Sequence, residues 1–379
     1  MEALKPYIPV RVTNMAGVDL SAYSFDWSLT FSVLLMNDRG RIYHRYGSGD
    51  GRDAEAMLSI DSFVATLAYG LQSHAAFGRA EPAAPKRDRF TVEDLPPMKR
   101  RLAKNKPSCI HCHTVGDMFR EQAEEERRFR FDDVWRHPPA DRLGIRLDRD
   151  DQTRIVEVLP GSPAAVAGVR AGEHLVVVNG VEVRTEADVR AALDPLSGDA
   201  ASVAVELSAS APARGVEGGV ASRPEVRPSS GTTTRRADAG SATVARRRVV
   251  LELPAGWRRG DALDLAWRSD MWHLRPNPGF GGAFLGSDEK KKLGLPADRF
   301  ALRVNYLIDF GAHPEDGRNA KRAGLKKGDV VFGVDGRGDF LNERQFQAWW
   351  RLEQKPGRTA KLDVLSGGVR KTIELPVLP

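Results

Sequence analysis

A seven-residue block occurs twice in this chain, and the repetition limits the possible folds more than any other feature. Ala167-Gly168-Val169-Arg170-Ala171-Gly172-Glu173 returns as Ala323-Gly324-Leu325-Lys326-Lys327-Gly328-Asp329, and Asn179-Gly180 returns as Asp335-Gly336, both at an offset of 156 residues. Internal self-similarity at a fixed offset indicates two copies of one structural unit. We therefore predict a multidomain chain and exclude a single small module.

Each block is followed by the same order of predicted elements, one helix and then two strands. The predicted helices and strands are Thr185–Leu193, Val203–Leu207 and Arg248–Leu253 in the first copy, and Asn342–Trp350, Lys361–Val364 and Lys371–Leu375 in the second. A short turn with Gly367-Gly368 joins the last two strands of the second copy, whereas residues 209–247 join those of the first. These residues are rich in Pro, Gly, Ser and Arg, so we predict a disordered insertion within a hairpin.

The chain carries six more Lys and Arg than Asp and Glu, and this excess is concentrated in one stretch. Residues 209–248 contain eight Arg and three acidic residues, a net charge of +5, and no aromatic side chain that could stack on a base. We therefore predict no nucleic-acid partner. The longest apolar runs, such as Leu175–Val178, are far shorter than the ~20 residues of a membrane helix. The sequence predicts no transmembrane segment.

The first copy resembles the PDZ domains of bacterial HtrA-type proteases. The residues that carry this resemblance are Arg142-Leu143-Gly144-Ile145, the strand Arg154–Leu159, Gly161-Ser162-Pro163-Ala164, the repeated block and Val178-Asn179-Gly180. The second copy, with Gly281-Gly282-Ala283-Phe284 and Ala301–Val304, resembles the same family. Its gap between the strand and the block is ten residues longer, which leaves the geometry of residues 311–318 open.

The resemblance implies a groove between a strand and a helix, where a peptide adds as an extra strand. We expect the loop Arg142, Leu143, Gly144 and Ile145 to capture a C-terminal carboxylate with backbone N–H groups. Ile145 and the helix residues Val189 and Leu193 are expected to select an apolar last residue. In the second copy, Gly281, Gly282, Ala283 and Phe284 are the corresponding candidates. The alternative occupant of the first groove is the chain's own end, Leu375–Pro379.

The first 78 residues predict a small α/β unit. We expect strands over Ile8–Val12, Thr30–Met36 and Arg41–Tyr46, and a helix that begins after Ser59. Phe25-Asp26-Trp27 and the turn Asn37–Gly40 resemble the C-terminal half of a thioredoxin-like domain. Together with the two PDZ-like copies, this layout is similar to a bacterial family of thioredoxin-like/PDZ (seleno)proteins. The segment lacks the redox Cys-x-x-Cys of such domains, so it carries no nucleophile.

Cys109-Ile110-His111-Cys112-His113 contains both cysteines of the chain, which excludes a disulfide-stapled scaffold. The spacing is that of covalent c-type haem attachment, where the two thiols bind the porphyrin and His113 binds the iron. Haem c is therefore the candidate cofactor. Met98 and His137 are the remaining candidates for a sixth ligand.

Three other interpretations of this motif stay open. Cys109 and Cys112 could form a dithiol switch. Both thiols and His113 could bind a metal ion with a fourth ligand such as His137. The motif could also be the start of a surface helix that holds two thiols without function.

The predicted organisation is α+β and multidomain. It comprises a truncated thioredoxin-like domain (1–78), a Pro-rich and basic linker with a helical Cys-x-x-Cys-His connector (79–140), and two PDZ-like β-barrel or sandwich domains (141–256, with the insertion 209–247, and 257–379). Within the connector, residues 79–108 are expected to be extended and Asp117–Arg136 to form one surface helix that ends before Pro138. His44 and His74 are expected at the surface.

The predicted function is that of a peptide-binding or protein-binding scaffold. The alternative is an electron-transfer or dithiol redox protein that uses Cys109, Cys112 and His113. No Gly-x-Ser-x-Gly motif or protease domain is present, so we expect no hydrolase. The N-terminus has no secretory signal pattern, which predicts a cytoplasmic protein; a periplasmic or envelope location would apply if the true start lies upstream.

Overall fold

The computed structural model describes residues 2–23, 25–29, 31–47, 55–77, 88–104, 109–211, 245–311 and 313–379. The chain divides into two compact units. One comprises Met1–Gly49, Glu55–Thr91 and His137–Trp257, and the other includes Val92–Arg136 and Arg258–Pro379. No helix in the described ranges is both long and apolar enough to cross a membrane.

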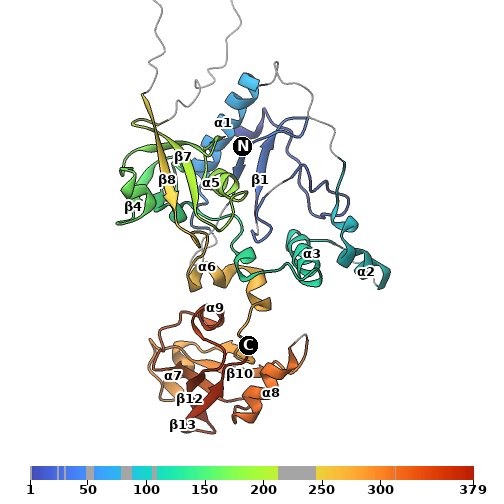
Figure 1. The fold of residues 1–379 in the computed structure, drawn as a ribbon, viewed down its shortest axis with the longest axis vertical. Helices are drawn as coiled ribbons and strands as arrows, with labels where there is room; N and C mark the ends of the chain where they lie inside the picture. The colour runs from blue at the N-terminus through green and yellow to red at the C-terminus, as the bar shows by residue number, and fades with distance from the viewer. Residues whose placement is uncertain are drawn as a thin grey trace, which may run out of the picture. The chain divides into compact units, whose positions relative to one another are not determined.

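The N-terminal part of the first unit is a hairpin with one helix. Strands β1 (Val33–Met36) and β2 (Ile42–Tyr46) pair antiparallel, and α1 (Ile60–Phe77) packs beside them (Figure 1). The Asn37 side chain closes the turn by accepting hydrogen bonds from the N–H groups of Arg39 and Arg41. Ser59 caps α1 by accepting from the N–H of Ser62, as predicted.

The prediction of a strand over Ile8–Val12 was wrong. These residues are extended and exposed, and among the described residues no strand pairs with them. Pro9 lacks the N–H that one edge of such a strand would need. The strand predicted from Thr30 begins only at Val33. The described hairpin and helix do not identify a thioredoxin fold, which stays a prediction.

The first repeat fills the remainder of the first unit. Its elements are β3 (Ile145–Leu147), β4 (Ile155–Val158), α4 (Pro163–Val166), β5 (His174–Val178), β6 (Val181–Glu182), α5 (Glu186–Leu193), β7 (Ala201–Ser208) and β8 (Arg246–Leu253), preceded by the 3-10 turn η4 (Ala140–Leu143). They form a two-stranded sheet, β3-β4, and a four-stranded sheet in the order β6-β5-β7-β8. A buried apolar cluster that includes Ile155, Leu175 and Val205 fills the space between the elements.

The insertion interrupts the hairpin β7–β8 without removing any of its pairs. All pairs from Ala201↔Leu253 to Ser208↔Arg246 are present, so β8 begins two residues before the predicted Arg248. Arg247 also forms an ion pair with Glu173 at 2.6 Å. Residues 212–244 lie outside the described residues, and so does most of the predicted disordered segment.

Deleting residues 212–244 and joining Ala211 to Ala245 through Gly-Gly is expected to change the free energy of unfolding by less than about 1 kcal/mol, because loop-closure entropy depends only weakly on length. Urea unfolding of the full and shortened chains measures this. A matched deletion that also removes Arg246 and Arg247 should destabilise the unit more, since it shortens β8 and breaks the ion pair to Glu173. Equal losses in both deletions would contradict the prediction.

The second unit contains the connector and the second repeat. Its elements are η2 (Val92–Asp94), α2 (Pro96–Lys104), α3 (Cys112–Glu125), η3 (Phe131–Val134), α6 (Ala262–Trp267), η5 (Ser269–His273), β9 (Phe280–Phe284), α7 (Ser287–Lys292), β10 (Leu302–Leu307), α8 (Pro314–Arg322), β11 (Val330–Val334), α9 (Glu343–Glu353), β12 (Thr359–Ser366) and β13 (Val369–Pro376). The strands form one antiparallel sheet in the order β13-β12-β11-β10-β9. Phe280, Phe346 and Trp350 lie in its buried core.

The two repeats share backbone hydrogen bonds at corresponding positions. Leu159 N–H donates to Gly144 C=O in the first repeat, and Ile308 N–H donates to Gly279 C=O in the second. The repeated blocks are likewise held in the same way, by Gly172 N–H to Ile155 C=O and by Gly328 N–H to Val304 C=O. Asn179 and Asp335 both have positive φ, 49° and 51°, in equivalent turns. The extra residues of the second repeat lengthen α8, which has 9 residues against 4 in α4.

Two predictions for the connector were wrong. Residues 96–104 form the helix α2 instead of an extended segment, because Pro96 and Pro97 occupy its first turn, where no N–H is needed. The helix predicted over Asp117–Arg136 starts earlier, at Cys112, and ends at Glu125. Arg127 has a positive φ of 56°, which a continuing helix does not allow.

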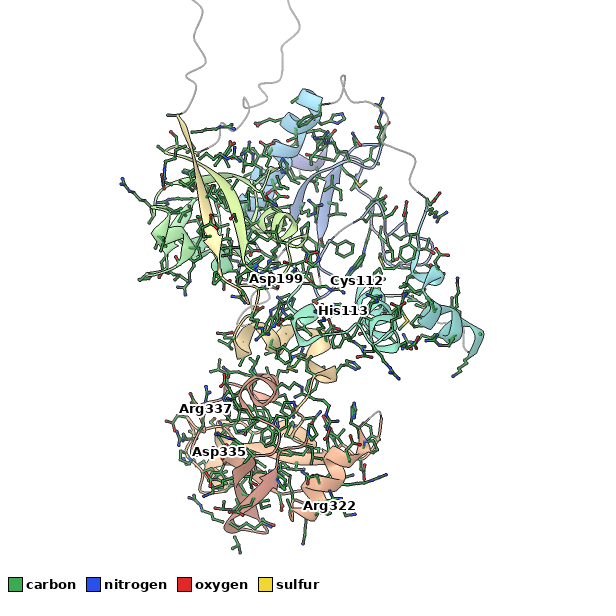
Figure 2. All side chains as sticks on the ribbon, in the orientation of Figure 1. Cys112, His113, Asp199, Arg322, Asp335 and Arg337 are labelled. Carbon is green, nitrogen blue, oxygen red and sulfur yellow. The ribbon has the colours of Figure 1, made fainter. Side chains whose placement is uncertain are left out.

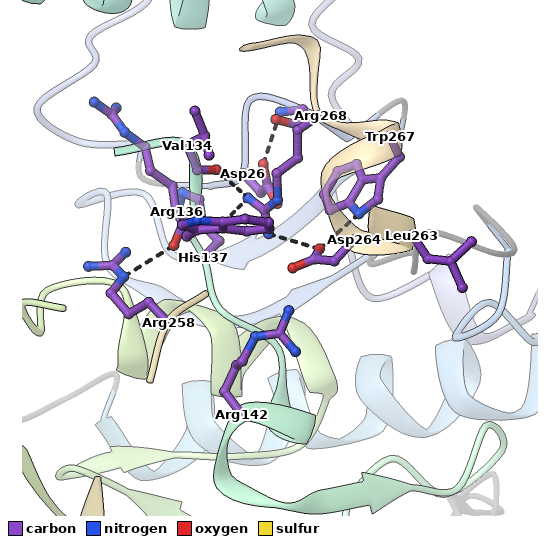
Figure 3. A network of polar contacts seen from close by, with 12 residues as sticks. Asp26, Val134, Arg136, His137, Arg142, Arg258, Leu263, Asp264, Trp267 and Arg268 are labelled. Atoms are coloured by element: carbon purple, nitrogen blue, oxygen red, sulfur yellow. Dashed lines mark hydrogen bonds and ion pairs between the residues drawn. The ribbon is translucent and has the colours of Figure 1, made fainter. Parts of the chain in front are cut away.

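Arg268 connects α6 to the end of the connector within the second unit. Its Nη1 donates to the carbonyls of Val134 and Arg136, both at 2.8 Å, and its Nη2 contacts Asp264 at 3.2 Å (Figure 3). The Arg268 side chain is only 2% exposed. Burying a guanidinium is costly unless its donors find acceptors, and here the two carbonyls and Asp264 provide acceptors for Nη1 and Nη2.

Candidate peptide-binding edges and the Cys-x-x-Cys-His motif

The strand β3 has one free edge. In the described part of the chain it pairs only with β4, and the register joins Ile145 to Val158 and Arg146 to Glu157. Gly144 C=O accepts from Leu159 N–H, so Gly144 bonds toward β4. Because the direction alternates along a strand, the backbone N–H and C=O of Arg146 also point toward β4, whereas those of Ile145 and Leu147 point to the open edge. This edge can accept a further strand.

The loop that precedes β3 is held in one conformation by its glycine. Gly144 has φ = 85°, and a Cβ at this position would overlap the side chain of Ser162. Two loop N–H groups are already used, since Arg142 N–H donates to Pro139 C=O and Gly144 N–H donates to Asp141 C=O. Leu143 N–H belongs to the 3-10 turn η4, so Ile145 N–H is the candidate donor of the predicted carboxylate loop.

The three predicted selectivity residues lie in one cluster. Ile145, Val189 and Leu193 all have an exposed fraction of 0% and belong to the apolar core of the first repeat. The structure thus brings these residues together but covers them in the conformation described. None of the three side chains is accessible from the surface in this conformation.

Residues 137–140 run along α5 immediately before the loop. His137 N–H donates to Asp194 at 2.8 Å, and Ala140 N–H donates to Glu186 at 3.4 Å. Arg190 donates to the carbonyl of His137 at 3.4 Å. Glu186, Arg190 and Asp194 are four residues apart and therefore share one face of the helix. The chain's own backbone lies on this face.

A buried polar network, which was not predicted from the sequence, connects the N-terminal hairpin to α5. His44, expected at the surface, is 1% exposed. Its Nδ1 lies 3.2 Å from Asp188 Oδ2, and its Nε2 lies 2.9 Å from Ser73 Oγ. Asp188 also accepts from Arg45 N–H at 2.8 Å. The only signal in the sequence was an acidic residue in the first turn of α5.

The side chains of His44, Ser73 and Asp188 link three elements of the first unit. Ser73 lies inside α1, and its Oγ meets His44 of β2. Asp188 is 0% exposed and also accepts from the N–H of Arg184. The network holds β2 against α5.

The second repeat has a corresponding strand, β9, which in the described chain pairs only with β10. Here the edge is occupied by α9. Glu343 Oε1 accepts from Gly282 N–H at 2.9 Å, and Gln347 Nε2 donates to Phe280 C=O at 2.8 Å. Burial raises the pKa of Glu343, and burial together with the nearby Glu343 carboxylate raises the pKa of Tyr306.

The chain's C-terminus is held within its own repeat. Val377 N–H donates to Arg358 C=O, and Val377 C=O accepts from Gly357 N–H. Leu375 and Val377 are buried in the core of the second unit. The hypothesis that Leu375–Pro379 fills the groove of the first repeat was therefore wrong, because these side chains already pack elsewhere.

The Cys-x-x-Cys-His motif lies at the start of α3. Cys112 is the first residue of the helix and His113 follows it (Figure 2). Cys109 and Cys112 do not form a disulfide. Cys109 is exposed, and the buried Nε2 of His113 has no hydrogen-bond partner among the described residues. In the described ranges no three His, Cys, Asp or Glu side chains gather in a metal-binding group. Met98 is fully buried in the second unit, and His137 belongs to the first.

Haem attachment stays a prediction. If it occurs, expression with a cytochrome maturation system is expected to give a covalent, heat-stable chromophore that Cys112→Ala weakens and His113→Ala shifts in its absorbance spectrum. A colourless product whose two thiols titrate reversibly as a pair would favour the dithiol interpretation instead.

Comparison with known proteins assigns part of the first repeat. Residues 154–205 match the family profile of the PDZ domain, a range that includes β4, α4, β5, β6 and α5. The first repeat therefore contains a PDZ domain. None of the curated proteins compared with the chain matches it.

Two solved structures show weak similarity. The HtrA-type protease AlgW with a decapeptide is 21% identical, with a TM-score of 0.21, over 35% of this chain and 37% of that chain. A variant of AlgW with a decapeptide is 18% identical, with a TM-score of 0.21, over 38% of this chain and 40% of that chain. The chain thus corresponds to well under half of the length of either structure.

Proposed function

We propose that this chain is a peptide-binding scaffold whose main site is the edge of β3 in the PDZ domain of the first repeat. The observation that carries the proposal is the edge of β3, unpaired in the described chain, next to the residues that match the PDZ family. The match begins at residue 154, and β3 and the Gly144 loop precede it and pair with its first strand, β4. A peptide adds to this edge as a strand, and its main chain bonds to Ile145 and Leu147.

The peptide's free carboxylate is held at the loop Arg142–Ile145, with Ile145 N–H as the principal donor. Its last side chain reaches the floor formed by Ile145, Val189 and Leu193. These residues are apolar, so the ligand ends in Val, Leu or Ala. Access requires residues 137–140 to move away from α5, and the hydrogen bonds of Ala140 and Arg190 along this face, both 3.4 Å, are long.

The second repeat, residues 257–379, is proposed to be a second PDZ domain. The shared hydrogen bonds around Gly144 and Gly279 support this assignment, as do the equivalent turns at Asn179 and Asp335. The N-terminal hairpin is proposed to brace α5 through His44 and Asp188. In this account the first 78 residues support the peptide site and need no redox chemistry of their own.

An array of C-terminal peptides probed with the full chain tests the proposal. We expect enrichment of peptides that end in Val, Leu or Ala with a free carboxylate. The same peptides with an amidated end, or with Asp or Lys at the last position, should bind at least about tenfold more weakly, because they lose the charged contact or the apolar contact. Equal binding of free and amidated peptides would contradict the proposed loop.

A further inference from the structure

The backbone groups that α9 satisfies in the second repeat are those that an added strand would use. Along one edge of a strand, the N–H and C=O groups of alternate residues point outwards. On β9 the outward-pointing groups belong to Phe280 and Gly282. Gln347 binds the C=O of Phe280, and Glu343 binds the N–H of Gly282. The two side chains thus take the place of a neighbouring strand.

The glycines of β9 make this approach feasible. A Cβ on Gly281 would lie 2.9 Å from Glu343 Oε1 and still closer to the hydroxyl of Tyr306. Any larger residue would therefore push Glu343 and Tyr306 away from the strand. Gly281 thus fits a strand whose edge is covered by side chains of its own domain, whereas Gly282 fits the close approach of the β10 backbone at Arg303.

The same helix positions make different contacts in the first repeat. The residues there are Glu186 and Arg190, which form an ion pair with each other at 2.6 Å. They also contact Ala140 N–H, the carbonyl of His137 and the carboxylate of Asp26. The two repeats therefore differ in the contacts that these two helix positions make. In the second repeat both side chains bind the edge of β9, whereas in the first they bind each other and the backbone of residues 137 and 140.

We propose that the edge of β9 is a second peptide-binding surface, held closed by Glu343 and Gln347, and that its partner is an extended peptide that must displace both side chains. The inference rests on the proposed function and extends it, since it assigns different affinities to the two repeats. The first repeat binds peptide in the chain as it stands, and the second binds weakly until the two side chains are removed.

Photo-crosslinking with the full chain tests this inference. The probe is a pool of ten-residue peptides with a free carboxylate, an apolar last residue and a benzophenone side chain near the end. Crosslinks are mapped by mass spectrometry. In Glu343→Ala/Gln347→Ala we expect crosslinks to Phe280–Phe284 to increase at least about tenfold, because two competing hydrogen bonds are gone. Crosslinks to Ile145–Leu147 should be unchanged.

Two variants serve as matched controls. Glu343→Gln keeps an acceptor for Gly282 N–H, and Glu353→Ala removes an exposed carboxylate from the same helix, so neither should open the edge. Gln347 also accepts a hydrogen bond from the buried Arg351, so its replacement can destabilise the fold. If the double variant does not fold, Glu343→Ala is used alone, and it should give a smaller increase in crosslinks to β9.

Failure of the inference and failure of the proposed function give different results. A folded Glu343→Ala variant without any gain at β9 would overturn the inference, as would a wild-type chain that already crosslinks at β9 as strongly as the double variant. Absence of crosslinks at β3 in every variant would instead contradict the peptide site of the first repeat.

Discussion

Replacing Asp188 with Ala is expected to lower the free energy of unfolding of the first unit by about 3–5 kcal/mol, the usual cost of breaking a buried polar network by removing one partner. Asp188 is 0% exposed and accepts hydrogen bonds from Arg45 N–H, from Arg184 N–H and through its contact with His44. Without the carboxylate these buried donors lose their acceptor. Urea unfolding, followed by hydrogen exchange of β5 and β7, measures the loss.

Asp199→Ala is the matched control, because Asp199 is exposed in the same unit and its loss should change stability by less than about 0.5 kcal/mol. Asp188→Asn keeps the shape and one acceptor, so an intermediate loss is expected. A loss of less than about 1 kcal/mol for Asp188→Ala would show that the hairpin does not brace α5 through this carboxylate.

The loop before β3 should be nearly as sensitive. Gly144→Ala is expected to cost about 2–4 kcal/mol, of which ~1–2 reflects a left-handed conformation for a residue with a Cβ and the rest reflects overlap with Ser162. Gly161→Ala provides the comparison. Gly161 also has a positive φ, 72°, but a Cβ there would have open space, so only the conformational cost applies. Thermal or urea unfolding of the wild-type chain and the two variants gives the loss of stability for each replacement.

The overlap can be tested separately from the strain. Ser162 caps α4 by accepting from Ala165 N–H, so a shifted Ser162 also weakens that helix. Replacing Ser162 with Gly in the Gly144→Ala background should recover part of the stability. Equal losses for Gly144→Ala and Gly161→Ala, with no recovery in the double variant, would contradict the packing described for this loop.

Features encoded locally were predictable from the sequence. The repeat predicted two copies of one fold, and the helices α5 and α9 begin after Thr185 and Asn342, whose side chains cap them. The strand pairs β7–β8 and β12–β13 also follow the predicted order. The caps and the hairpin β12–β13 depend on residues close together in the chain, and β7–β8 was predictable by comparison with that hairpin.

Features that depend on distant contacts were not predictable. The burial of His44 depends on Asp188, which lies 144 positions later in the chain. The closure of β9 depends on side chains of α9 about 60 positions away, and α2 begins at prolines that a composition-based argument assigns to an extended segment. The candidate loop Arg142–Ile145 was predicted correctly as a turn before a strand, but the burial of its residues 143–145 was not.

Hydrogen exchange of the full chain with and without peptide tests the central claim most directly. With a pool of peptides that end in Val and carry a free carboxylate, exchange is expected to slow at Ile145 and Leu147, because a peptide at this edge bonds to these N–H groups. The same peptides in amidated form should change the exchange little, because they lack the carboxylate that the loop holds. Protection that appears elsewhere in the chain but not at β3, or that is equal for both peptide forms, would contradict the central claim.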